Sequence, residues 1–286
     1  MARRLITFLF CLLLAAPATA AELSGTLQKV AESGRLVIGH REASYPFSYL
    51  GQQGQPTGYS IDLCLRIAAA MQSELGLPEM AIEYVPVTPD DRMARLLDGT
   101  IDIECGSTTN TLTRQERVDF SHIIFVTGAK LLVKANRGIH DFGDLEGKRL
   151  ALASDTTTEA GVKSVIERLG LEVVVMAVQD HDEGFEALQA DEVDCYISDH
   201  ILLHGLRQRA ENPDDYLVVG EFLSYEPYAL MLRRDDAAFR LVINRTLSEL
   251  FRTDEIELIY RDWFEPMGAR PGDLLRAAVR LQALPK

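Results

Sequence analysis

The segment IECGSTTNTLTRQERVDFS, residues 103–121, places five hydroxyl side chains shortly before an arginine, Arg114. A guanidinium is a permanent cation whose planar fork of N–H groups matches a carboxylate, and hydroxyl groups can add single hydrogen bonds around it. This combination is typical of a site that binds a small anion. The five hydroxyl residues are Ser107, Thr108, Thr109, Thr111 and Thr113.

The rest of the chain is acidic, so positive charge for an anionic ligand must come from a few placed residues. The 286 residues carry a net charge of −14. This balance argues against nucleic acid and anionic membranes as partners, because both attract basic surfaces.

The first 20 residues, MARRLITFLFCLLLAAPATA, have the pattern of a cleaved secretory signal peptide: two arginines, an apolar run and small residues before the cleavage site. The apolar run is shorter than the roughly 20 residues that a membrane span needs. We therefore expect a freely diffusing periplasmic protein that begins at residue 21, with a net charge of about −16 after Arg3 and Arg4 are removed.

Three cysteines remain after cleavage: Cys64, Cys105 and Cys195. They form no Cys-x-x-Cys motif or Cys/His cluster, so we expect no metal site and no cofactor. An odd number leaves at least one thiol unpaired in a monomer, and the pairing stays open. Cys64 falls on the apolar face of a helical pattern, and we interpret it as a small buried apolar residue.

Strand-like apolar runs alternate with helical patterns along the mature chain, which predicts an α/β fold with mainly parallel sheets flanked by helices. The expected strands are 35–39, 82–86, 101–105, 130–134, 149–153, 172–178, 193–197 and 228–233. The expected helices are 25–32, 60–75, 92–97, 158–169, 183–190, 199–209, 236–253 and 255–264.

Two segments repeat each other at a distance of 92 positions: RMARLLDGTIDIECGS from Arg92 and GFEALQADEVDCYISD from Gly184. Each reads as a helix, a polar turn and a strand that opens with a hydrophobic residue and Asp, which predicts two similar lobes. We expect the first lobe to comprise residues 21–128 and 229–286, and the second residues 129–228. Two extended crossings would join them.

In open parallel sheets, ligands bind outside the carboxyl ends of the strands. The candidate site residues gathered there or at the adjoining helices are Arg41, Arg92, Ser107, Thr109, Arg114, Thr156, Thr157, His181 and Asp199. Several have a structural alternative. A single arginine is usually solvated, the threonines or Asp199 could cap the helices that follow them, and His181 could cap its helix or lie in solvent.

The order and spacing of several motifs resemble the polar-amino-acid-binding proteins of bacterial ABC transporters, known as solute-binding protein family 3. The segments GHREASYPFSY, ECGSTTN and QDHDEGF are similar to the glutamate/aspartate-binding branch, and YRDWF to the end of the family's domain. The resemblance implies a two-lobed periplasmic-binding-protein fold of type II. It also implies a monomer that binds L-glutamate or L-aspartate between its lobes and delivers it to a membrane permease, with no catalytic residues.

By the same resemblance, each candidate residue has an expected role. Arg114 and Thr109, with Thr157 from the opposite lobe, would bind the α-carboxylate, and the neighbouring Thr156 is counted among the ligand-binding residues. Ser107 and Asp199 would bind the ammonium group. Arg41, Arg92 and His181, the last as a cation if protonated, would bind the side-chain carboxylate. The family pattern has a serine where this chain has Pro89.

A second class of function is an enzyme, because the fold also resembles exported cyclohexadienyl dehydratases. An enzyme of this kind needs a general acid at the leaving group. His181 is the candidate in this sequence, and no residue near it in the sequence stands out as its partner. The sensing module of a receptor is disfavoured, because no transmembrane segment is recognised after Phe264.

Overall fold

The computed structural model describes residues 23–285, and the predicted signal peptide lies outside this range. Five strands form the first sheet, in the spatial order β5, β1, β6, β13, β7. Strand β1 pairs in parallel with β5 and β6, whereas β13 pairs antiparallel with β6 and β7. The bounds are β1 Arg35–His40, β5 Ala81–Pro86, β6 Ile103–Glu104, β7 Val118–Thr127 and β13 Glu226–Arg233.

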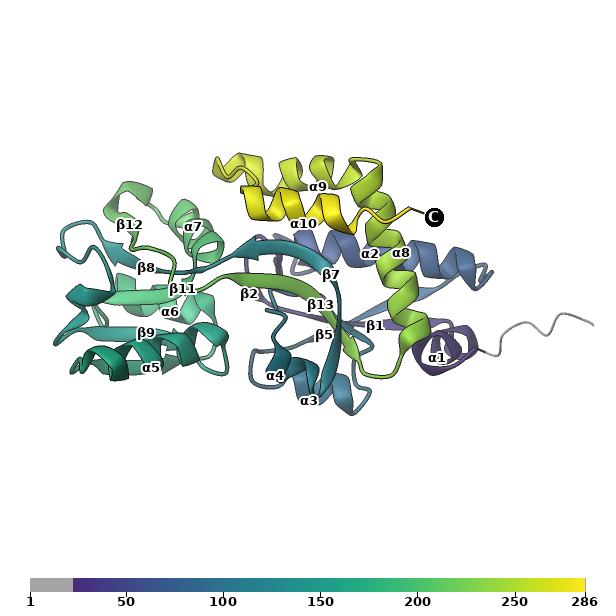
Figure 1. Cartoon of the computed structure of the whole chain (residues 1–286), viewed down its shortest axis with the longest axis horizontal. Helices are drawn as coiled ribbons and strands as arrows, with labels where there is room; N and C mark the ends of the chain where they lie inside the picture. The colour runs from purple at the N-terminus through teal and green to yellow at the C-terminus, as the bar shows by residue number, and fades with distance from the viewer. Residues whose placement is uncertain (1–22, 286) are drawn as a thin grey trace, which may run out of the picture.

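The second sheet has the order β10, β9, β11, β8, β12 and lies beside the first along the long axis of the molecule (Figure 1). Its strands β10, β9 and β11 are parallel, and β8 and β12 join antiparallel. Both sheets are therefore mixed, with more antiparallel pairing than the sequence predicts. The bounds are β8 Ala129–Lys134, β9 Arg149–Ala153, β10 Val174–Val178, β11 Cys195–Asp199 and β12 Tyr216–Val219.

The chain passes between the sheets twice. Strand β7 leads through Gly128 into β8, and residues 220–225 lead from β12 back to β13 (Figure 1). The two crossings touch, because a Cβ atom on Gly128 would lie 2.1 Å from the backbone oxygen of Ser224. Only glycine fits this position without moving one of the crossings.

Helices cover both sheets, and their ends follow local signals. Helix α5 begins after Thr156, whose side chain accepts from the N–H of Glu159, and it ends at Gly170 in the left-handed conformation. The helices are α1 Gly25–Ser33, α2 Tyr59–Glu74, α3 Arg92–Leu97, α4 Leu112–Gln115, α5 Thr157–Leu169, α6 His181–Gln189, α7 His200–Arg209, α8 Ala237–Arg252, α9 Glu255–Phe264 and α10 Asp273–Gln282. Among the described residues, none of the helices has the length and apolar character to cross a membrane.

Most expected elements are present, with shifts of one or two residues at their ends. Four were missed: β7, β12, α4 and α10. Strand β7 has register shifts against β13, which break the alternation of apolar residues that would reveal a strand. Three short strands, β2 Ala43–Ser44, β3 Ser48–Leu50 and β4 Pro56–Thr57, were not expected either.

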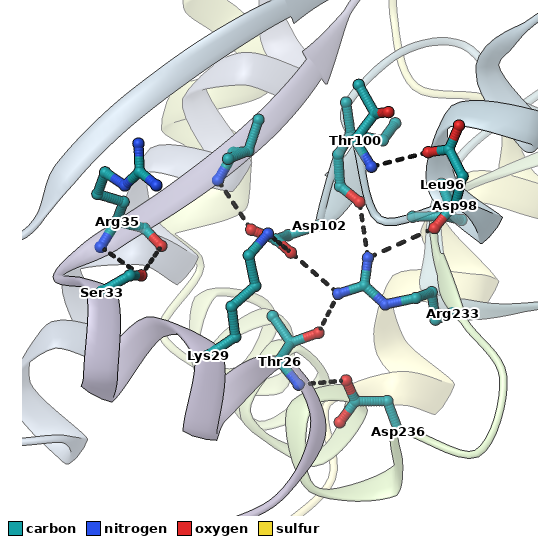
Figure 2. A network of polar contacts seen from close by, with 12 residues as sticks. Thr26, Lys29, Ser33, Arg35, Leu96, Asp98, Thr100, Asp102, Arg233 and Asp236 are labelled. Atoms are coloured by element: carbon teal, nitrogen blue, oxygen red, sulfur yellow. Dashed lines mark hydrogen bonds and ion pairs between the residues drawn. The ribbon is translucent and has the colours of Figure 1, made fainter.

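The aspartates that open the two repeated strands make the same contact in each sheet. Asp102 accepts from the backbone N–H of Val37 at 3.0 Å, and Asp194 accepts from the backbone N–H of Arg149 at 2.9 Å. Figure 2 shows that the buried carboxylate of Asp102 also binds Lys29 and Arg233, and thereby joins α1 to the sheet. The repeated sequence therefore corresponds to a repeated structural connection.

Cys64 and Cys105 form a disulfide bond. The bond gives the pairing that the sequence left open, and Cys64 is buried in the core as expected. The bond ties α2 to the segment that follows β6 and carries the hydroxyl cluster. Cys195 is the free thiol among the described residues, and burial raises its pKa.

Candidate functional site

A small cavity lies where the two sheets face each other. All nine residues selected from the sequence line it: Arg41, Arg92, Ser107, Thr109, Arg114, Thr156, Thr157, His181 and Asp199. Pro89, Thr158, Ser198 and Leu202 complete the lining. The elements of both sheets thus bring together residues that are up to 158 positions apart in the sequence.

Arg114 lies on α4. This helix begins after Thr111, whose hydroxyl accepts from the Arg114 backbone N–H at 3.2 Å. Arg114 Nη1 donates to the carbonyl of Thr109 at 2.8 Å, and its Nη2 to the carbonyl of Asp155 at 3.4 Å. Burial, together with the charge of Arg92, lowers the pKa of Arg114 to about 10, so the side chain remains cationic at neutral pH. A guanidinium has five N–H donors, and those not bound here are available to an anion.

The first turn of α5 approaches the same point from the second sheet. Thr156 caps this helix, as the alternative interpretation predicted, and its hydroxyl also donates to the carbonyl of Ala153 at 2.8 Å. Thr157 is the first helical residue, and its hydroxyl donates to Glu226 at 2.7 Å. With both hydroxyls engaged and the N–H of Glu159 bound to Thr156, the free donors at this end are the backbone N–H groups of Thr157 and Thr158. The N–H groups at a helix start commonly bind anions.

Asp199 supplies a carboxylate next to this first turn of α5. It occupies the position before α7, yet its side chain makes no capping hydrogen bond, so the capping interpretation is wrong. The carboxylate instead accepts from the hydroxyls of Tyr228 and, at 3.3 Å, Thr158. Burial and the nearby Glu226 raise the pKa of Asp199 to about 7.

Arg41 and Arg92 form a second cationic group. Both side chains are buried, and burial lowers the pKa of Arg41 to about 10, with a further contribution from Arg92. Arg92 donates to the hydroxyl of Thr108 at 2.5 Å, and this hydroxyl donates to Glu104 at 2.7 Å. The Arg41 guanidinium, by contrast, has no hydrogen-bond acceptor within the described part of the chain. A bound anion could take that place.

Glu104 is a site residue that the sequence reasoning missed. It is completely buried, and its charge favours the cationic forms of Arg41, Arg92 and Arg114. Gly106 leaves room for it, because a Cβ atom there would lie 2.2 Å from Glu104 Oε1. An acid inside the strand segment DIEC is the sequence signal that could have found it, since a carboxylate between buried positions needs a cation.

Glu226 was missed as well. Its two carboxylate oxygens accept from Thr157 and, at 2.6 Å, from the hydroxyl of Ser224. The residue begins β13 and is buried, although it lies in an otherwise apolar strand. A glutamate at this position of the strand is the sequence signal that could have identified it as a site residue.

The surroundings of His181 favour its neutral form, so the cationic form that the sequence left open is not supported. Burial and the charges of Arg41 and Arg92 lower its pKa to about 3. It also has a partner that the sequence did not reveal, the hydroxyl of Tyr196, which lies 2.6 Å from Nδ1. Asp180, not His181, caps α6 by accepting from the N–H of Glu183.

The hydroxyl-rich segment, residues 107–113, lies between these groups. Thr109 Oγ1 lies 3.4 Å from Thr157 Oγ1 of the opposite sheet, and backbone hydrogen bonds attach Thr108 and Asn110 to β13. Ser107 lines the cavity. Among residues 23–285, no group of three His, Cys, Asp or Glu side chains is arranged to hold a metal ion.

Residues 36–266 match the family described as bacterial extracellular solute-binding proteins, family 3. The chain is 41% identical to the L-glutamate/L-aspartate-binding protein of Pseudomonas aeruginosa, over 91% of this chain and 86% of that protein. It is 36% identical to the glutamate/aspartate import solute-binding protein of Escherichia coli (strain K12), over 88% of this chain and 82% of that protein.

Solved structures share the fold. An ancestral arginine-binding protein bound to arginine is similar with a TM-score of 0.73 and 29% identity, covering 81% of this chain and 98% of that one. The ancestral amino-acid-binding protein AncCDT-1, described as a precursor of cyclohexadienyl dehydratase, has a TM-score of 0.74 and 27% identity, covering 84% of this chain and all of that one. The two-lobed α/β fold predicted from the sequence is confirmed by these similarities.

Proposed function

This chain belongs to the bacterial extracellular solute-binding proteins of family 3, and we propose that it captures L-glutamate or L-aspartate in the periplasm and delivers it to the permease of an ABC importer. The observation that carries the proposal is the charge pattern of the cavity. Three buried or half-buried arginines and one buried aspartate line it together. An amino acid with a second carboxylate has the complementary pattern of two negative groups and one positive group.

The α-carboxylate binds at Arg114, with the N–H groups at the start of α5 on its other side. A fork of guanidinium donors and a helix amino terminus both favour a carboxylate. The ammonium group binds Asp199 and the hydroxyl or carbonyl of Ser107. Asp199 thereby gains a charged partner that it lacks among its neighbours, whose contacts with it are hydroxyl groups.

The side-chain carboxylate binds at Arg41, Arg92 and His181. The unbound guanidinium of Arg41 is the main donor, and Arg92 is oriented by its contact with Thr108. Pro89 lines this part of the cavity and offers no hydroxyl group to the side-chain carboxylate. Glutamate and aspartate differ by one methylene, worth about 0.8 kcal/mol of burial. The charge pattern of the cavity therefore fits both amino acids and does not distinguish between them.

We also propose how the protein reaches the periplasm and how its two lobes are organised. Residues 1–20 direct export and are removed, and the chain acts as a monomer. The lobe comprising residues 21–128 and 229–286 and the lobe comprising residues 129–228 close on the ligand, since half of the contacts come from each side.

The dehydratase-like alternative is disfavoured by the state of His181. A general acid must carry a proton that it can give up near the working pH. With its pKa lowered to about 3 by burial, His181 is deprotonated at neutral pH and cannot serve as one. The relatives named above are described as binding or import proteins.

Native mass spectrometry of protein purified from cells, followed by calorimetric titration with glutamate and aspartate, tests the proposal. We expect a retained ligand of the mass of one of the two, and saturable binding of both. Absence of binding after the protein is refolded to remove any retained ligand would contradict the proposal. Turnover of arogenate-like compounds would support the enzyme instead.

A further inference from the structure

Tyr196 lies directly behind His181, on the side away from the cavity. Its hydroxyl is 2.6 Å from His181 Nδ1, and both residues are buried. The Tyr196 ring has little freedom, because a Cβ atom on Gly184 of α6 would lie 2.4 Å from its Cε2. His181 and Gly184 are on consecutive positions of the same helix face, three residues apart, so the histidine and the tyrosine are fixed against each other.

The length of this hydrogen bond indicates its direction. An N–H donor usually lies roughly 2.7–3.2 Å from an oxygen acceptor, whereas an O–H donor comes closer, so 2.6 Å favours the tyrosine hydroxyl as the donor to Nδ1. Ser198 Oγ lies 3.5 Å from the same nitrogen, at the limit of a hydrogen bond. Nδ1 is therefore the acceptor, and the hydrogen of Tyr196 is directed at it.

We propose that Tyr196 is a positioning residue that keeps the hydrogen of the neutral His181 ring on Nε2, so that the ring presents an N–H donor to the ligand side chain. Nδ1 accepts from Tyr196, and a neutral imidazole has one N–H. Nε2 has no partner within residues 23–285, and His181 lines the cavity. The inference rests on the proposed function, because it assigns the source of acid selectivity in that site.

This arrangement distinguishes acids from amides. Arg41 and Arg92 can only donate, and His181 held in this tautomer also donates towards the ligand. A carboxylate accepts from all three, whereas the NH2 group of glutamine or asparagine would face donors. The opposite tautomer would offer a lone pair on Nε2 and relieve that mismatch. It requires the Tyr196 hydrogen to turn away from Nδ1.

The test is Tyr196→Phe, which removes the hydroxyl and leaves the ring that packs on Gly184. We expect calorimetry to show weaker glutamate binding with unchanged or stronger glutamine binding. The ratio of the two affinities should fall at least fivefold. Tyr216→Phe is the matched control, because Tyr216 packs on Phe185 of the same helix and does not line the cavity. The ratio of glutamate to glutamine affinity in Tyr216→Phe should equal that of the unaltered protein.

A spectroscopic measurement on the unaltered protein tests the same proposal without a variant. Nitrogen NMR of the histidine-labelled protein should show the His181 signals of a protonated Nε2 and an unprotonated Nδ1. A protonated Nδ1 in the unaltered protein, or an unchanged affinity ratio in a folded Tyr196→Phe variant, would overturn the proposal. If the unaltered protein bound no acidic amino acid, the proposed function would fail, and the NMR tautomer would still be measurable.

Discussion

The hydroxyl of Thr157 donates a hydrogen bond of 2.7 Å to the carboxylate of Glu226 and so attaches the first turn of α5 to the beginning of β13. Helix α5 follows β9 of the second sheet, whereas β13 belongs to the first sheet. The lobes therefore meet beside the cavity, and Arg114 adds a second contact across it at the carbonyl of Asp155. The proposed ligand site therefore takes its groups from both lobes.

Replacing Arg114 with alanine should weaken glutamate binding by roughly 2–5 kcal/mol, because a buried carboxylate would lose its charged partner. Calorimetry gives the affinity, and circular dichroism should show an unchanged fold. Arg117→Ala is the matched control, since Arg117 follows three residues later and is exposed. Equal affinities of the two variants would place the α-carboxylate elsewhere.

Replacing Asp199 with asparagine should stabilise the free protein at high pH. The folded-state pKa of Asp199, about 7, lies above the ordinary value of 3.8, so the native state binds this proton more tightly than the unfolded state does. Stability is therefore lost as pH rises from about 4 to about 7. The substitution removes that loss, which amounts to at most about 4 kcal/mol at pH 8. Urea unfolding at pH 4 and pH 8 measures the difference, with the exposed Asp214→Asn as control.

A constant difference between the two pH values would show that Asp199 titrates normally. The same variant should bind glutamate more weakly than the unaltered protein, because the ammonium group would lack an anion.

Glutamate affinity itself should rise about tenfold between pH 6 and pH 8, because the ammonium group requires the ionised form of Asp199 and its pKa is about 7. Calorimetry at pH 6 in two buffers of different ionisation enthalpy should reveal a proton released on binding. In Asp199→Asn the affinity should not change with pH. A flat profile in the unaltered protein would contradict the prediction.

Glutamate should bind at least tenfold more tightly than glutamine, because unsatisfied donors cost roughly 1–3 kcal/mol. This ratio should be the same at pH 6 and pH 8, since Asp199 contacts a group that both ligands share and the pKa of His181, about 3, is far below this range. Arg41→Met should reduce the ratio. Competition calorimetry measures it, and equal affinities in the unaltered protein would leave a general binder of polar amino acids.

Removing the disulfide by the double substitution Cys64→Ala and Cys105→Ala should lower the free energy of unfolding by about 2–4 kcal/mol, since the bond closes a long loop. The separation of the two residues is 41 positions. Urea unfolding gives the value, and Cys195→Ala, which removes the buried free thiol, is the control. An effect no larger than that of the control would mean that the loop is constrained without the bond.

The cavity lining could be predicted because its residues follow strand ends or begin helices, and these positions are visible in the sequence. The residues that orient them could not. Tyr196 and Glu104 lie inside strands, where their alternation with apolar neighbours looks like core packing. Tyr228 reaches Asp199 from a strand 29 positions later. Such contacts depend on which strands become neighbours, and local patterns do not encode this.

The cysteine pairing could not be predicted for the same reason. Cys64 and Cys105 lie on different elements, and three cysteines allow three pairings, so the sequence left the choice open. The helical pattern predicted correctly that Cys64 faces the core. It could not show that β6 places Cys105 opposite it, because β6 is only two residues long and its predicted limits were wider.

The contact of Gly128 with Ser224 restricts how the two lobes can move. Two bodies joined by one flexible segment can rotate about three axes, but two segments that touch resist twisting and sliding, because either motion would separate or compress them. Bending across the pair remains. The binding cycle then has one coordinate, the angle between the lobes, and this angle also sets the outer surface that a permease meets. A permease that recognised that angle alone would distinguish the occupied protein from the empty one without touching the amino acid.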